Sequence, residues 1–139
     1  MITIKCSRQE AEVILQHFFP VINLYKQTRL NNVSHMDRLS EQYLGAVIIN
    51  SLLEETERIF RNKVYSSAIK KFTFNFTDAQ AVVLYKSLMV LPIDSAKIYF
   101  VVLRNQWIEA LDQSLISIGL YEHEKRSNGE VYSYSDFEQ

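Results

Sequence analysis

Histidine and cysteine side chains could give this chain metal-binding or catalytic chemistry, because they coordinate zinc and act as bases or nucleophiles. The sequence contains three histidines, His17, His35 and His123, and one cysteine, Cys6. No two of the histidines have the four-residue spacing with which a helix presents two ligands to one metal. One cysteine forms neither an internal disulfide nor a zinc-binding thiolate cluster, and its alternating apolar surroundings predict a buried, unreactive thiol. We therefore expect no metal site and no cofactor, and we expect His17 at the edge of the core.

Three neighbouring carboxylates are the other candidates for catalysis. They are Glu54, Glu55 and Glu57. A cleft that raised the pKa of one of them could make it a general acid. However, Glu54 and Glu57 precede Arg58 and Arg61 by four residues, and this spacing is typical of ion pairs on a solvated helix face. No serine has the Gly-x-Ser-x-Gly surroundings of a hydrolase nucleophile. The sequence therefore favours a protein without catalytic activity, and it leaves open an active site assembled from distant residues.

A basic stretch is the candidate for contacts with nucleic acid. Its members are Arg58, Arg61, Lys63, Tyr65, Lys70 and Lys71. The five cations could contact phosphates, and the tyrosine could stack on a base. No helix-turn-helix or RNP signature accompanies them, and cations near the end of a helix also stabilise the helix dipole. A nucleic-acid-associated regulator is therefore the alternative hypothesis rather than the leading one.

An aromatic stripe on a predicted helix is the candidate protein interface. The proposed members are Tyr99, Leu103, Arg104 and Trp107, together with Tyr132 and Tyr134 near the carboxyl terminus. Aromatic residues and arginine are enriched at the centres of protein interfaces. The same spacing is also typical of a helix that faces a core, so Trp107 has two interpretations. The leading hypothesis is a non-catalytic intracellular interaction protein, either a homodimer or a subunit bound to another protein.

Two similar segments, separated by 70 residues (Ile2 against Phe72), predict an internal repeat. In Ile2–Ser7 and in Phe72–Thr77, apolar residues alternate with polar ones, as in a half-buried strand. Each segment ends at a hydroxyl side chain followed three residues later by Glu10 or Gln80, which is the pattern of a capping box. The sequence therefore predicts twice that a short strand leads directly into a helix.

The helices of the first half are predicted from a proline and from a second cap. Pro20 predicts a break near Phe19, with a further helical piece from about Val21, because an interior proline removes a hydrogen bond. Ser34 with Asp37 predicts the beginning of a long, central helix that reaches about residue 62.

The second half is predicted to end in another long helix. This helix begins at Asp94 or Ser95 and ends at residue 118, because Gly119 is well placed as its stop signal. The segment Ile98–Leu103 is entirely apolar, so it is expected to be buried on every side, in the core or at a subunit interface.

The last residues, 122–139, have two interpretations. They carry five acidic and two basic residues, a net charge of −3. Asn128 followed by Gly129 is a strong signal for a two-residue turn, and this predicts a β-hairpin. The alternative is an acidic tail that becomes ordered only on binding.

Together these patterns predict a predominantly helical α+β protein with one domain over residues 1–121. It consists of two βαα-like halves, about 1–68 and 69–121, with or without the hairpin at 122–139. Only three glycines and two prolines occur among 139 residues, which favours helices over turns. The longest apolar runs have six residues and no secretory signal precedes them, so we expect a cytoplasmic protein without a membrane span.

Overall fold

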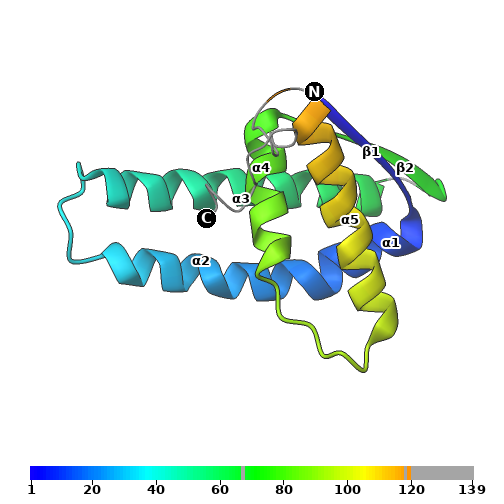
Figure 1. Ribbon diagram of the computed structural model, residues 1–139, viewed down its shortest axis with the longest axis horizontal. Coiled ribbons are helices and arrows are strands. Elements are labelled where there is room, and N and C mark those ends of the chain that lie inside the picture. Colours follow the sequence, from blue (N-terminus) through cyan, green and yellow to red (C-terminus); the bar gives the residue numbers. More distant parts are fainter. Residues whose placement is uncertain (67, 118, 120–139) are drawn as a thin grey trace, which may run out of the picture.

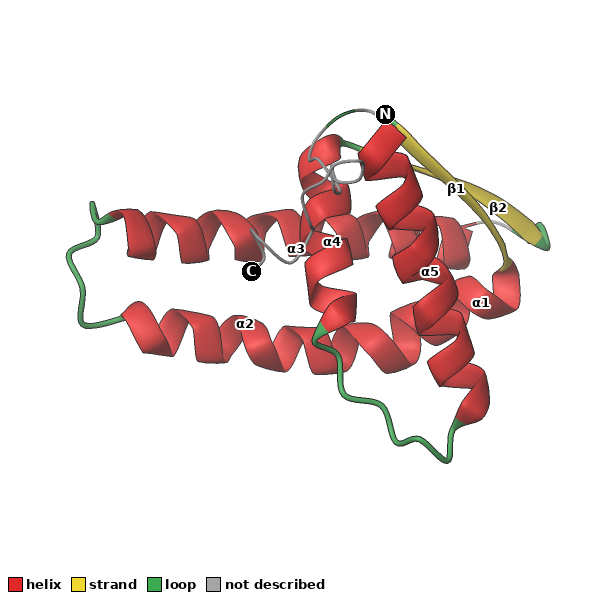
Figure 2. Ribbon diagram, in the orientation of Figure 1, coloured by secondary structure: helices red, strands yellow, loops and turns green. Residues whose placement is uncertain are grey.

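The structure, a computed structural model, describes residues 1–66, 68–117 and 119 and is mostly helical (Figure 1). The elements in chain order are β1 (Ile2–Ser7), α1 (Arg8–Val13), the π-helical turn η1 (Ile14–Phe18), α2 (Phe19–Val33), α3 (Glu41–Ser66), β2 (Lys71–Phe76), α4 (Asp78–Met89) and α5 (Ile98–Ser117). A small antiparallel sheet of β1 and β2 accompanies the helices (Figure 2), which confirms the helix-dominated α+β class. The predicted hairpin within 122–139 lies outside the described residues.

The two predicted strands pair with each other. Ile2 lies opposite Phe76, and Ile4 lies opposite Phe74, so that their side chains enter the core together. The alternate residues face solvent, where the Thr3 hydroxyl donates a hydrogen bond to the side chain of residue 75 at 2.8 Å. The period-two pattern therefore identified both strands and the buried face of each.

Both predicted capping boxes are present. The Ser7 hydroxyl accepts a hydrogen bond from the Glu10 amide, while the Glu10 carboxylate accepts one from the Ser7 amide. Thr77 and Gln80 repeat these two bonds at the start of α4. The reciprocal bonds satisfy amides that have no partner within the helix, so each strand leads directly into a helix.

The regular α-helix is interrupted before Pro20, but by a π-helical turn rather than by the predicted break, so the chain stays helical from α1 through α2. The turn η1 precedes the proline, and in it the Phe19 amide donates to the carbonyl of Ile14, five residues back. A π turn is wider than an α turn. The wider turn relieves the clash that the proline ring would make with the preceding turn of a regular α-helix. Pro20 then lies in the first turn of α2, where the absence of its N–H costs little.

The predicted beginning of α3 is also wrong. Residues 34–40 form a connection instead, in which the Asp37 carboxylate accepts a hydrogen bond from the amide of Leu39. The hydroxyl of Ser40 accepts one from the amide of Tyr43, so Ser40 caps the helix. Both Ser34 and Ser40 are good capping residues, and sequence alone does not rank them.

Helix α5 begins slightly later than expected and is not buried on every side. The carboxylate of Asp94 accepts a hydrogen bond from the Ala96 amide in the turn before the helix. Gly119 has a φ of +76°, the left-handed conformation expected just beyond a helix end. Leu103 is buried, but Ile98 is 69% exposed, because α4 and the sheet cover only one side of this helix.

Phe60 of α3 is the centre of the core. Its ring centroid lies 5.5 Å from that of Phe19 on α2, 4.4 Å from that of Phe74 on β2 and 5.6 Å from that of Trp107 on α5. Helix α4 packs against both α3 and α5 (Figure 1). One aromatic ring therefore connects the sheet with helices from both halves of the chain.

We predict that Phe60→Ala lowers the free energy of unfolding by about 3–5 kcal/mol, the usual cost of removing a buried aromatic ring. Tyr65→Ala on the same helix is the matched control, because Tyr65 is 65% exposed and its loss is expected to cost less than about 0.5 kcal/mol. Urea titration of both variants measures the two values. Equal costs would contradict the central role of Phe60.

We also predict that Cys6 is unreactive in the folded protein. Its side chain lies on the buried face of β1, and desolvation together with the nearby charge of Glu10 raises its pKa to about 12. The reactive thiolate is therefore scarce at pH 8. A thiol reagent is expected to label Cys6 in denaturant and not in buffer, and rapid labelling in buffer would show that this strand opens readily.

Candidate functional site

The proposed stripe on α5 divides between the core and the surface. Leu103 and Trp107 are buried, so within this chain they serve the core rather than an exposed surface. The Arg104 guanidinium donates a hydrogen bond to the Leu91 carbonyl at 2.8 Å and fastens α5 to the connection that precedes it. Tyr99 is partly exposed. The remaining two members, Tyr132 and Tyr134, lie outside the described residues.

Tyr99 belongs to a small apolar patch on the first turns of α5. Ile98 and Val102 expose their side chains beside it. Desolvation, and secondarily the charge of Glu10, raise the pKa of the Tyr99 phenol, so its hydroxyl stays protonated. The patch offers apolar contact and one hydrogen-bonding group.

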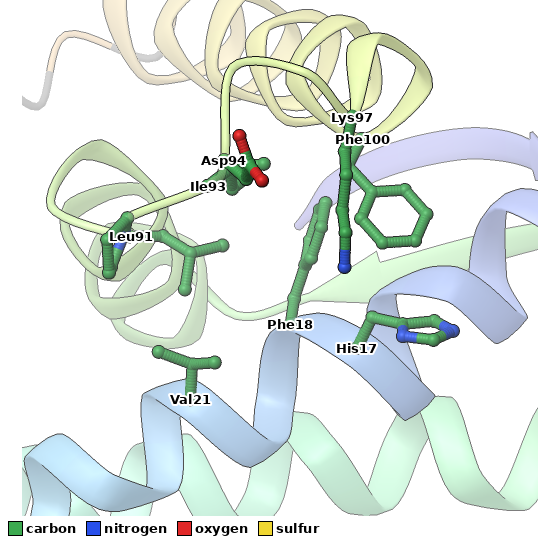
Figure 3. A pocket seen from close by; sticks show the side chains of 9 residues that line it. His17, Phe18, Val21, Leu91, Ile93, Asp94, Lys97 and Phe100 are labelled. Carbon is green, nitrogen blue, oxygen red and sulfur yellow. The ribbon is translucent and has the colours of Figure 1, made fainter.

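A pocket next to this patch is too small for most ligands. His17, Val21 and Leu91 line it together with Lys97 and Phe100 (Figure 3). The His17 ring lies 4.9 Å from the Phe100 ring, and the Lys97 ammonium lies 5.6 Å from the same ring. The volume is about 150 Å³, whereas ligand pockets usually measure about 300–1,000 Å³. The geometry therefore gives His17 a packing role against α5.

The predicted acid–base residues are engaged in structural contacts. Glu57 is buried rather than solvated, and it accepts hydrogen bonds from Arg61 at 2.6 Å and from Asn23 at 3.2 Å. Glu54 pairs with Lys26 of α2 at 3.8 Å, which corrects the expected pair with Arg58. Within the described ranges, no three His, Cys, Asp or Glu side chains gather as a metal site would require.

The basic stretch occupies two separate places. Arg58, Arg61 and Tyr65 share one side of α3, because they are three and four residues apart. Lys63 lies half-buried on another side of the helix. Beyond the helix, Lys70 precedes the sheet and Lys71 begins β2. The structure thus brings together only three of the six candidates, and Arg61 already pairs with Glu57.

The sequence analysis missed a projecting pair of helices, which we call the arm. It comprises residues 24–33 of α2, the connection 34–40 and residues 41–53 of α3. In Figure 1 these parts of α2 and α3 lie beside each other and extend beyond α4, α5 and the sheet. Among the described residues, each of the two helices is therefore the other's main neighbour in the arm.

The contact between the two helices of the arm is partly polar. The Arg29 guanidinium donates to the side-chain oxygen of Asn50 at 2.6 Å, and the Asn50 amide donates to the Lys26 carbonyl at 3.1 Å. Desolvation lowers the pKa of Arg29. An open groove of about 500 Å³ runs along this contact; most of its lining is polar, and Val47 of α3 borders it. These bonds align α2 with α3, because a shift along either helix would leave the buried Asn50 without partners.

The outer face of the arm is apolar. Leu44, Val47 and Ile48 of α3 are 44%, 38% and 57% exposed. They are spaced by three and four residues and lie within Gln42–Leu53, a run of twelve residues without any charge. Such a run has no charged side chain to mark a solvated face of the helix. This uncharged run is the sequence signal that would have identified the surface.

Gly45 lies among these apolar residues. A Cβ atom built on it would meet no atom within 4 Å among the described residues outside its own stretch of helix. A glycine inside a helix costs roughly 0.5–1 kcal/mol relative to alanine. Packing within the described part of the chain therefore gives no reason for glycine at this position.

Comparisons with known proteins identify no relative, since no family model, curated protein or solved structure matches this chain. No helix in the described ranges combines the length and apolar character of a membrane span. The outer face of the arm, defined by Leu44, Val47 and Ile48, is the candidate functional site.

Proposed function

We propose that this chain is a non-catalytic protein–protein interaction module that self-associates through the outer face of the arm. The observation that carries the proposal is the exposure of Leu44, Val47 and Ile48 within an uncharged helical run. Apolar surface that the chain itself leaves in water is a source of binding free energy. We place this module in the cytoplasm, because its only cysteine is a free, buried thiol. The similar capping boxes also support an origin of the two halves by duplication.

The size of the apolar face favours a weak association. Complete burial of a valine, leucine or isoleucine contributes about 1.5–3 kcal/mol. Six half-exposed side chains from two copies therefore contribute roughly 5–9 kcal/mol before any costs. Lost translational and rotational freedom opposes association by about 4–15 kcal/mol. The dimer is therefore expected to depend strongly on protein concentration.

We predict that Ile48→Glu abolishes self-association, because each copy would place an unpaired carboxylate in an apolar contact. Sedimentation velocity over a wide concentration range measures the effect, and the unmodified protein is expected to change from monomer to dimer as concentration rises. Leu24→Glu is the matched control: Leu24 is 68% exposed on α2 and is not part of the outer face.

The control variant should dimerise like the unmodified protein, and both variants should unfold at similar temperatures, since both side chains are exposed. A protein that stays monomeric at all concentrations would overturn self-association. Equal effects of the two substitutions would show that added charge, rather than this face, is responsible.

Nucleic-acid binding is the second candidate function. It is supported by Arg58, Arg61 and Tyr65, which share one side of α3, and by the exposure of Arg58, Lys70 and Lys71. Contacts with phosphates release counterions, so this function predicts an affinity that falls steeply with salt.

The combined substitution Arg58→Gln and Lys70→Gln would then reduce the slope of log affinity against log salt by about two. Fluorescence anisotropy with single-stranded and duplex probes measures this slope, and Lys86→Gln, an exposed position on α4, is the control. Absence of salt-dependent binding to either probe would remove the hypothesis.

A further inference from the structure

We infer that the groove between α2 and α3 of the arm is a binding site for a free α-amino acid with an apolar side chain. In this site the ammonium group of the ligand binds Asn23 and Glu54, and its carboxylate binds Lys26. The inference goes beyond the proposed self-association, because the groove lies between the two helices of one arm and needs no second copy.

A buried acceptor without a donor marks the inner end of the groove. The side-chain nitrogen of Asn23 donates a hydrogen bond to the Glu57 carboxylate at 3.2 Å. Because an ionised carboxylate only accepts hydrogen bonds, this bond fixes which way the Asn23 amide is turned. The other amide atom, Oδ1, is buried, and no donor in the described part of the chain reaches it. Native proteins leave few buried acceptors unpaired, so a bound molecule that donates to Oδ1 would complete this site.

The groove has the size of a ligand site and a neutral lining. Its volume is about 500 Å³, within the usual range of about 300–1,000 Å³. The Lys26 ammonium on α2 and the Glu54 carboxylate on α3 lie 3.8 Å apart. Charge-assisted hydrogen bonds are shorter, about 2.7–2.9 Å, so both groups retain the capacity to bind a ligand. One positive and one negative charge in the lining favour a zwitterion over an ion of a single sign.

The lining changes from polar to apolar along the groove. The pair of Lys26 with Glu54 lies toward the core, whereas Leu30 and Val47 lie nearer the tip of the arm. Asn23 and Leu30 are two helical turns apart, so the two ends of the groove are separated by about 10 Å. An amino acid such as leucine fits within this span. Its charged groups lie at the inner end, and its side chain contacts the apolar residues at the outer end.

A zwitterion matches the hydrogen-bonding groups of the inner end better than a simple ion does. An ammonium group has three donors, and Asn23 Oδ1, the Glu54 carboxylate and the Ser51 hydroxyl are three acceptors in the lining. The ligand carboxylate takes the Lys26 ammonium, so one long ion pair becomes two charge-assisted contacts. A simple amine would face the like charge of Lys26. A simple carboxylate would leave Asn23 Oδ1 without a donor.

The Lys26 side chain also controls access to the buried acceptor. A helical side chain lies over the turn that precedes its own Cα atom, so Lys26 covers the surface beside Asn23, three residues earlier. Its side chain is only 18% exposed, in agreement with this position. When the Lys26 ammonium turns to the ligand carboxylate, it opens the way to Asn23 Oδ1. Both contacts therefore form together.

NMR titration of the isotope-labelled protein with leucine tests the site and the ligand class. The amide signals of residues 23–30 and 47–54 are expected to shift, whereas those of α5 stay in place. Leucine methyl ester and N-acetyl-leucine each lack one charge, so each is expected to bind about tenfold more weakly or worse. Absence of shifts at millimolar leucine would overturn the inference. Equal affinities for the three compounds would overturn it as well.

Substitutions in the protein test which side chains hold the ligand. Glu54→Gln removes the charge that binds the ammonium group and is expected to raise the dissociation constant for leucine about tenfold or more. Glu41→Gln is the matched control, because Glu41 is also an exposed carboxylate on α3 and does not line the groove. Asn23→Ala is expected to abolish binding. It also deprives Glu57 of a donor, so Glu54→Gln, at a side chain that is 63% exposed, is the decisive variant. Equal affinities of Glu54→Gln and Glu41→Gln would contradict the site.

The Ile48→Glu variant separates this inference from the proposed function. Ile48 is not among the residues that line the groove, so this variant is expected to bind leucine with unchanged affinity although it does not self-associate. If the unmodified protein binds leucine but stays monomeric at every concentration, self-association is wrong and the inference stands. If the protein dimerises but does not bind leucine, the inference alone is overturned.

Discussion

The contacts of the Phe60 ring set the arrangement of the whole molecule. This ring meets aromatic side chains from α2, β2 and α5, so the sheet and the packed helices gather around one place on α3. Phe60 lies in the carboxyl-terminal part of a helix of 26 residues. A helix of that length measures about 39 Å, roughly the diameter of a small domain or more. Since the core holds one end of α3, its other end has to project, and α2 projects with it.

The sequence predicted those elements whose signals are local. The alternation in Ile2–Ser7 and the capping box that follows need only neighbouring residues, and both appear as predicted. The effect of Pro20 on the helix was predicted wrongly, because a π turn before the proline accommodates its ring. No sequence pattern in Ile14–Phe18 indicates such a turn. The start of α3 was misjudged because Ser34 and Ser40 offer the same chemistry, and the choice between them depends on how long α2 remains paired with α3.

The candidate site was harder to predict, because an apolar pattern does not tell what covers it. Trp107 and Ile48 both lie in apolar helical segments, yet the first is buried and the second is exposed. The difference arises from the side of the helix on which each residue lies: Trp107 faces the Phe60 cluster, whereas Ile48 lies on the side of α3 away from the core, which its neighbours Ile49 and Leu52 contact. Similarly, the charge of Glu57 predicted a solvated position, yet Glu57 is buried because Asn23 of α2 and Arg61 of α3 donate hydrogen bonds to it. The four-residue spacing indicates Arg61 as a partner, but it does not indicate Asn23.

In the arm, polar groups lie between α2 and α3 whereas apolar side chains face solvent, and this arrangement limits the stability of the free arm. The contact of the buried Asn50 with the half-buried guanidinium of Arg29 specifies the alignment of the two helices but contributes little net stability, since desolvation offsets the bonds that are gained. Gly45 weakens the helix further. The outer apolar face can stabilise the arm only when a partner removes it from water. Binding and ordering of the arm are therefore linked: any molecule that covers this face stabilises the aligned helix pair, and the aligned pair is what presents the face.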